Sequence, residues 1–188
     1  MTQEVSHNSL PSPPFNGGLV SIFTGDGKGK TTAAIGSVVR AAGHGLKVFI
    51  VFFAKGKDFV HGEFNVLSKL PNVTMASFGQ TGWVNKSEVK PEHKEQARRA
   101  LATARQAVLS GNYDLVVMDE VNIAIANKLI ELNEVVRLIN DKPQNVELIL
   151  TGRYADPKLV QMADLVTEML IIKHPYTRGI EARKGFDY

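Results

Sequence analysis

The sequence predicts an α/β fold in which a mostly parallel β-sheet is covered by helices on both faces. Short apolar segments alternate with segments rich in helix formers along the chain, which is the pattern of such folds. Several apolar segments lack polar alternation, as expected for strands that are buried on both sides. The composition agrees, because 44% of the 188 residues are hydrophobic and 22% are charged, as in an ordinary globular domain.

The first half of the chain contains three predicted strands and one predicted helix. Gly18–Thr24 is a short apolar strand, and Lys30–Ala42 is a helix that the following glycines stop. Leu46–Phe53 is rich in β-branched and aromatic residues, which favours a second strand. Val73–Phe78 is the third predicted strand.

The second half continues the alternation. His93–Leu109 is rich in strong helix formers, and Leu115–Met118 is a short apolar strand. A predicted helix at Asn133–Asn140 is followed by a strand at Val146–Leu150. Asp156–Ala163 begins with an Asp-Pro pair, which is typical of a helix start.

The two ends of the chain differ from the middle. Residues 1–17 contain Ser, Asn and three prolines, and we expect a flexible segment there. Residues 18–188 form one predicted domain, with Val166–Ile172 as its last strand. The polar, glycine-punctuated stretch His174–Tyr188 is expected to be a loop or a lid.

Charge and composition exclude several classes of function. The formal net charge is +3, but the chain has no long basic run, so we expect no nucleic-acid partner. The surplus reflects either a solvated surface or attraction to an anionic ligand. Cysteine is absent, which excludes disulfides and thiolate metal sites and fits a cytoplasmic protein. No apolar run is long enough to span a bilayer, so no membrane association is expected.

The stretch TGDGKGKTT (24–32) lies between the first predicted strand and helix and is typical of a phosphate-binding loop. It departs from the pattern G-x-x-x-x-G-K-[ST] in one respect, because Thr24 stands where glycine is usual. Alternating glycines let successive backbone amides face phosphate oxygens, and the helix N-terminus adds a favourable dipole. Lys30 can reach a phosphate and the Thr31 hydroxyl can ligate Mg²⁺. The alternative is a glycine-rich turn whose lysine faces solvent.

Two further motifs follow predicted strands. LVVMDE (115–120) ends in an acidic pair that can hold Mg²⁺ or Mn²⁺ beside a triphosphate, and its spacing leaves open whether Asp119 or Glu120 does so. Arg153 in LTGR can contact a phosphate or form a surface salt bridge. No base for phosphoryl transfer is evident.

Together these residues resemble the P-loop ATP:corrinoid adenosyltransferases. The resemblance spans about Gly18 to Tyr188 and rests on seven stretches in order: FTGDGKGKTTAAIG (23–36), RAAGHGLKV (40–48), FFAKG (52–56), GEFNVL (62–67), VVMDE (116–120), LILTGR (148–153) and KHPYTRGIEARKGFDY (173–188). It implies a P-loop NTPase-like (RecA-like) sheet. In that family threonine commonly opens the loop, so Thr24 is no defect.

The resemblance implies that ATP is bound backwards along the loop and that a cobalt(I) corrinoid attacks its ribose 5′ carbon, releasing triphosphate. The implied catalytic residues are Lys30, Thr31 and Glu120. The implied ligand-binding residues are Gly25, Asp26, Gly27, Lys28, Gly29, Lys30, Thr31, Thr32, Arg153, Phe78 and Trp83, and the metal residues are Thr31, Asp119 and Glu120. An electron donor such as a flavoprotein and a homodimer are also implied.

The aromatic stretch MASFGQTGWVNK (75–86) departs from the family pattern. Many relatives carry phenylalanine and tryptophan only one residue apart, whereas four residues separate Phe78 from Trp83 here. Trp83 either faces the corrinoid or caps the core beneath a loop. Phe52 stands where relatives often have glutamine.

Two other functions stay open at this point. One is a P-loop nucleoside kinase or ATPase, which needs a phosphate acceptor site and a base. The other is a non-catalytic ATP-dependent switch, in which Mg²⁺-ATP orders the loops 55–63 and 79–90 for a partner.

Overall fold

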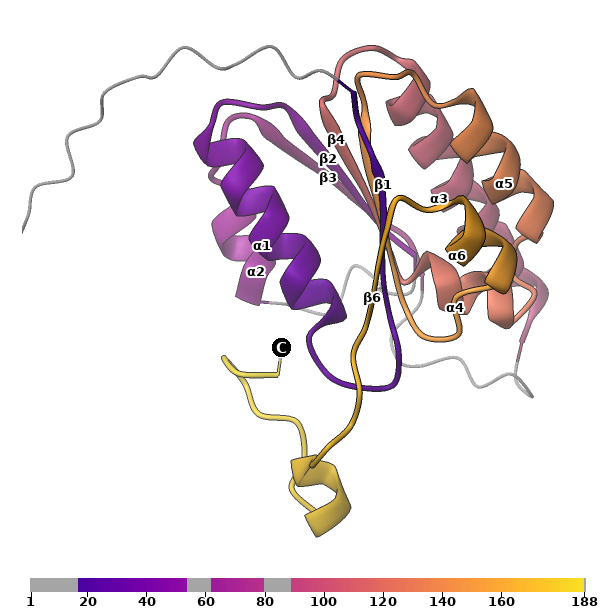
Figure 1. Cartoon of the computed structure of the whole chain (residues 1–188). Helices are drawn as coiled ribbons and strands as arrows, with labels where there is room; N and C mark the ends of the chain where they lie inside the picture. Colours follow the sequence, from indigo (N-terminus) through magenta and orange to yellow (C-terminus); the bar gives the residue numbers. More distant parts are fainter. Residues whose placement is uncertain (1–16, 54–61, 80–88, 188) are drawn as a thin grey trace, which may run out of the picture.

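A computed structural model describes residues 17–53, 62–79 and 89–187 of the chain. It contains a six-stranded, all-parallel sheet with the strand order β3-β2-β4-β5-β1-β6 (Figure 1). The strands are β1 Val20–Thr24, β2 Val48–Phe52, β3 Val73–Ser77, β4 Leu115–Asp119, β5 Glu147–Thr151 and β6 Leu165–Glu168. The predicted α/β fold class is therefore confirmed.

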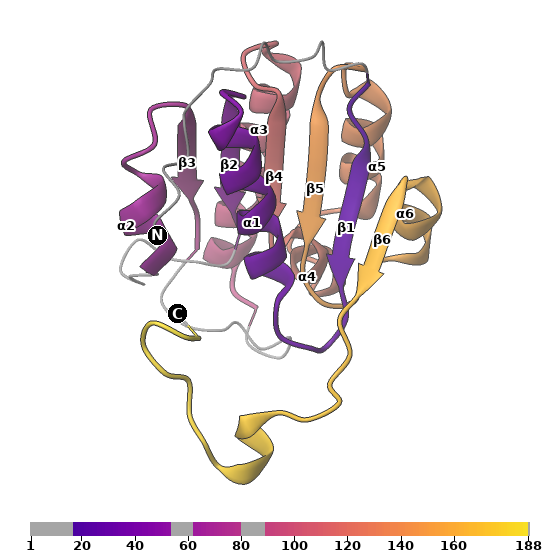
Figure 2. The ribbon, with the colours of Figure 1, turned by 60° about the vertical axis from the view of Figure 1, so that its left-hand side comes forward.

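Helices cover both faces of this sheet (Figures 1 and 2). On one face lie α1 Lys30–Gly43 and α2 Gly62–Leu67. On the other lie α3 Pro91–Leu109, α4 Val121–Ala126, α5 Leu132–Asp141 and α6 Pro157–Met162. A short 3-10 helix, η2, spans Pro175–Arg178.

Burial explains the continuous apolar strands of the sequence. Every residue of β2 and β4 is buried, because helices pack on both sides of these central strands. The edge strand β6 is different, since all four of its residues are exposed. The core therefore lies around β2, β4 and β5, and the β6 edge is open.

The last strand differs from the prediction. We expected Val166–Ile172, but β6 ends at Glu168. The reason is its neighbour: among the described strands β6 pairs only with β1, and β1 ends at Thr24, where the phosphate loop begins. Residues beyond Glu168 thus have no strand to pair with and leave the sheet below its carboxyl edge (Figure 2).

Other differences are smaller. The short helices α2 and α4 were not anticipated, because each spans only six residues and shows no clear period. The Asp-Pro start of α6 is confirmed, since the Asp156 carboxylate accepts the Lys158 N–H at 2.9 Å. The predicted flexible segment lies outside the described residues, apart from Gly17. Among the described helices, none is both long and apolar enough to cross a membrane.

Candidate phosphate-binding site

The loop between β1 and α1 has the backbone that the glycine pattern predicted. Gly25 and Gly29 adopt φ values of 92° and 122°, which residues with a side chain rarely adopt. Gly29 is also the N-cap of the 14-residue helix α1, and no side chain caps this end. The first N–H groups of the helix and its positive dipole end are therefore directed at the loop, as in an anion-binding site.

One wall of this loop is the segment that follows β6. The Gly27 N–H donates to the Met169 carbonyl at 2.7 Å. A Cβ atom on Gly27 would lie 2.7 Å from the carbonyl oxygens of Met169 and Leu170, so no larger residue fits there without moving the backbone. The sequence had suggested that this amide faces a phosphate, whereas in the structure the chain itself engages it.

Lys30 is buried beneath the loop, with only 8% of its surface exposed. Its Nζ donates to the Gly27 carbonyl at 2.7 Å. Burial lowers the pKa of Lys30 and the nearby Arg153 charge lowers it further, while the carboxylates of Glu120, Asp26 and Asp119 oppose this shift. A buried ammonium is costly unless it is paired, so this group favours an anion in the loop.

Asp119 joins three elements at the carboxyl edge of the sheet. Its Oδ1 accepts hydrogen bonds from the hydroxyls of Thr31 at 2.9 Å and Thr151 at 2.7 Å, and only 1% of the residue is exposed. Thr151 Oγ1 in turn accepts the Glu120 N–H at 2.9 Å. Thr151 was not among the predicted site residues, because its only signal in the sequence is its place at a strand end inside LILTGR.

Glu120 has a strained backbone. It lies in the left-handed region, with φ 63° and ψ 20°, and caps the short helix α4. This conformation costs a non-glycine residue about 1–2 kcal/mol, and such strain is concentrated at functional sites. Gly152 lies against it, because a Cβ on Gly152 would be 3.1 Å from Glu120 Oε2. Asp119 is in direct contact with Thr31, and the Glu120 charge acts on Lys30.

The unusual Thr24 has a structural role. Its hydroxyl accepts the Ala155 N–H at 3.2 Å and so links the start of the phosphate loop to the segment after β5. Arg153 from the same segment donates to the Asp26 carbonyl at 3.3 Å and lies 3.6 Å from the Asp26 carboxylate. The structure therefore places Arg153 on the phosphate loop, where it also forms the ion pair that was the alternative.

The oxygen donors at this edge fit Mg²⁺. The Thr31 hydroxyl and the Asp119 carboxylate lie together beside the loop, and both are hard ligands of the kind Mg²⁺ prefers. The described residues contain no group of three His, Asp or Glu side chains that could hold a metal alone. Such a site suits a cation that takes one or two protein oxygens and completes its shell with phosphates and water.

The predicted aromatic residues are only partly described. Phe78 is half-buried against the core, and the Arg99 guanidinium lies 5.9 Å from its ring centroid. Phe52 is fully buried and its ring lies 4.6 Å from that of Phe64. Trp83 lies outside the described residues.

The site has the features of a P-loop nucleotide-binding protein. These are the strand β1, the glycine loop that follows it, the buried Lys30 and the contact between Thr31 and Asp119. A solved structure with the same fold is the flagellar accessory protein FlaH from Methanocaldococcus jannaschii. The TM-score is 0.50 at 14% identity, covering 82% of this chain and 72% of that one. At that identity the likeness concerns the fold alone.

Sequence comparison identifies the family. Residues 16–188 match the family described as ATP:corrinoid adenosyltransferase BtuR/CobO/CobP. Corrinoid adenosyltransferases from Escherichia coli K12 and Pseudomonas aeruginosa are each 34% identical over 91% of this chain, covering 86% and 84% of their own lengths. Corrinoid adenosyltransferase CobA of Salmonella typhimurium is 33% identical over 91% of this chain and 86% of its own. The chain therefore belongs to the ATP:corrinoid adenosyltransferase family.

The Thr151 hydroxyl generates a stability prediction. Thr151→Val keeps the shape of the side chain but removes the donor to Asp119 and the acceptor for the Glu120 N–H. We expect the free energy of unfolding to fall by about 1–3 kcal/mol, because buried polar groups lose their partner. Urea denaturation measures this. Thr177→Val is the control, since that hydroxyl bonds in an exposed segment; equal losses in both variants would contradict the assignment.

Proposed function

We propose that this protein transfers the 5′-deoxyadenosyl group of ATP to the cobalt(I) of a corrinoid and releases triphosphate. Family membership supports the reaction class. The observation that carries the proposal is the loop itself, where a helix N-terminus and the buried Lys30 lie together and favour an anion. The groups that converge there stabilise charge, which is what a leaving triphosphate requires.

The proposed chemistry asks little of the protein beyond position and charge. The cobalt(I) electron pair forms the bond to the 5′ carbon while the bond from that carbon to the triphosphate oxygen breaks, so the electrons of the broken bond leave with the triphosphate. Cobalt(I) has no proton to lose, and no general base is needed. Lys30 and the amides at the start of α1 stabilise the leaving group, and alignment of the two substrates supplies much of the rate.

Thr31 and Asp119, with Glu120 beside them, are the residues proposed to hold Mg²⁺. Their contact distance and oxygen chemistry support this assignment. When bound, Mg²⁺ neutralises part of the triphosphate charge. Between the two acidic residues, the contact of Asp119 with Thr31 favours Asp119 as the metal-side group, while Glu120 stays close to the Lys30 charge.

The remaining partners are proposals from the family. An electron donor such as a flavoprotein would supply cobalt(I), and cytoplasmic localisation stays a prediction. A homodimer is also a proposal from the family. The apolar side chains of Leu165 and Val166 are exposed on the edge strand β6, and exposed apolar surface of this kind is typical of interaction sites.

The first test identifies the phosphate product. The protein is incubated anaerobically with Mg²⁺-ATP and chemically reduced cobalamin, and the products are followed by the cobalt(I) spectrum and by phosphorus NMR. We expect light-sensitive adenosylcobalamin and intact triphosphate. ADP and orthophosphate with unchanged cobalamin would indicate a kinase-type or ATPase reaction. Tight ATP binding without turnover would indicate a switch.

Lys30 generates the second test. Lys30→Ala removes the buried ammonium beneath the loop, and we expect most of the turnover to be lost because the leaving triphosphate is less stabilised. Lys94→Ala, which removes an exposed lysine from α3, is the matched control and should leave turnover unchanged. Near-normal turnover of Lys30→Ala in the same product assay would refute the proposed role.

Trp83 generates the third test. If Trp83 faces the corrinoid and excludes the lower axial ligand of cobalt(II), Trp83→Ala should slow assays that begin with cobalt(II) more than assays that begin with cobalt(I). Trp83→Phe keeps an aromatic ring and should recover part of the difference. Equal losses in both assays would mean that Trp83 only supports the core.

A further inference from the structure

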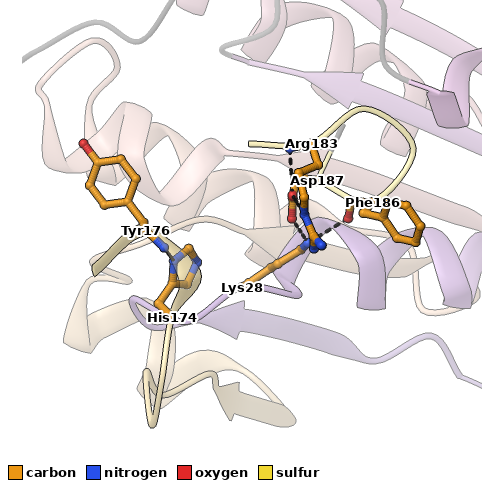
Figure 3. Close-up of polar contacts among 6 residues, drawn as sticks. All are labelled: Lys28, His174, Tyr176, Arg183, Phe186 and Asp187. Atoms are coloured by element: carbon orange, nitrogen blue, oxygen red, sulfur yellow. Dashed lines mark hydrogen bonds and ion pairs between the residues drawn. The ribbon is translucent and has the colours of Figure 1, made fainter. Parts of the chain in front are cut away.

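The end of the described chain returns to the phosphate loop. After β6 the chain leaves the sheet, forms η2 and turns back beneath the carboxyl edge (Figures 1 and 2). Its last residues reach Lys28, which lies between two loop glycines (Figure 3). Lys28 Nζ donates to the Phe186 carbonyl at 2.7 Å and forms an ion pair with the Asp187 carboxylate.

The carboxylate that contacts Lys28 is held in place by its own turn. Asp187 Oδ2 accepts the Arg183 N–H at 2.8 Å and Arg183 Nε at 3.2 Å, and the Asp187 N–H donates to the Arg183 carbonyl at 2.8 Å. The Arg183 guanidinium also lies 5.2 Å from the Phe186 ring centroid. Hydrogen bonds from Lys28 and Arg183 hold the pKa of Asp187 well below its usual range. The turn therefore presents an ionised, oriented carboxylate to the loop.

The start of this segment, residues 174–179, turns the chain back toward the phosphate loop. The His174 ring accepts the Tyr176 N–H at 3.2 Å and so begins η2 (Figure 3). Gly179 ends η2 with φ 74°. Apart from Glu181 and Asp187, the charged groups of residues 173–187 are cations: Lys173, Arg178, Arg183 and Lys184. The segment is therefore mainly basic, yet the side chain that pairs with Lys28 is the acidic Asp187.

We propose that the Arg183–Asp187 turn is a displaceable clasp, in which Asp187 holds the Lys28 ammonium until a polyphosphate takes it. The Lys28 ammonium is a mobile charge with three donors, and its side chain is 48% exposed. Exposed pairs of this kind are weak, so a polyphosphate with several charges outcompetes one carboxylate. Gly27 is similarly engaged, by Met169.

This inference rests on the proposed function, in which triphosphate is the product that must leave. Each time Lys28 returns to Asp187, the triphosphate loses one cationic contact. Asp187 is thus an affinity-determining residue, which weakens the binding of triphosphate and speeds its release. Nothing in the chemical step itself requires it.

The test measures the binding of inorganic triphosphate to the full chain by calorimetry at low salt. Asp187→Asn keeps the size of the side chain but removes its charge, and we expect triphosphate to bind about two- to fivefold more tightly. The gain should shrink at high salt, because exposed charges are screened. It should also vanish when Lys28→Ala is already present. Asp141→Asn is the matched control, because it breaks the exposed Arg105–Asp141 pair on other helices, and it should change nothing.

Hydrogen exchange gives a second, independent measurement on the unaltered protein. The Asp187 N–H is bonded within the turn, and saturating triphosphate should lower its protection as the turn is released. Unchanged or weaker triphosphate binding by Asp187→Asn, or unchanged protection, would overturn the clasp. If the unaltered protein binds no triphosphate but still forms adenosylcobalamin and triphosphate in the product assay, the clasp alone is refuted; if that assay yields neither product, the proposed function fails and the clasp with it. Normal triphosphate binding with no effect of Asp187→Asn refutes the clasp alone.

Discussion

The buried positive charge of Lys30 is the constraint on which the rest of the site depends. An ammonium with 8% exposure can be kept in a folded protein only if the surrounding groups stabilise it. The Gly27 carbonyl and the carboxylates of Asp119, Glu120 and Asp26 do so together. These groups lie at the end of β4 and in the loop between β1 and α1, and only a parallel sheet brings these two places to one edge. The buried charge of Lys30 therefore depends on the parallel fold, which brings its partners together.

Much of this arrangement could be predicted from the sequence, because it depends on local signals. Glycine spacing predicts the loop backbone, apolar runs predict the buried strands, and parallel order then places Asp119 near Thr31. The two sheet-edge roles that were not predicted, those of Thr24 and Thr151, depend on contacts between distant segments. The Thr24 hydroxyl meets a residue 131 positions away. No local pattern marks such a contact.

The end of β6 also could not be predicted from the sequence, because it depends on a contact between distant segments. Apolar residues resume after Glu168 and continue to Ile172, and propensity alone favours a longer strand. The partner strand decides otherwise, because β1 must stop where the loop turns away. Leu170, Ile171 and Ile172 are then exposed, with Ile172 at 85%. Their backbone is used instead as a wall for the loop, through the Met169 carbonyl. The Lys28–Asp187 contact spans 159 positions and is equally invisible in the sequence.

These contacts explain how one loop can both bind and release a highly charged ligand. A loop whose amides and ammonium groups had no partner would be strained by desolvation and would hold a polyphosphate tightly. Here the chain supplies its own acceptors: a carbonyl for the Gly27 amide, another for Lys30, and a carboxylate for Lys28. Binding therefore exchanges one set of partners for another, and the net affinity is the difference between the two sets. For a reaction whose leaving group is the most highly charged species present, that difference matters more than the strength of any single contact.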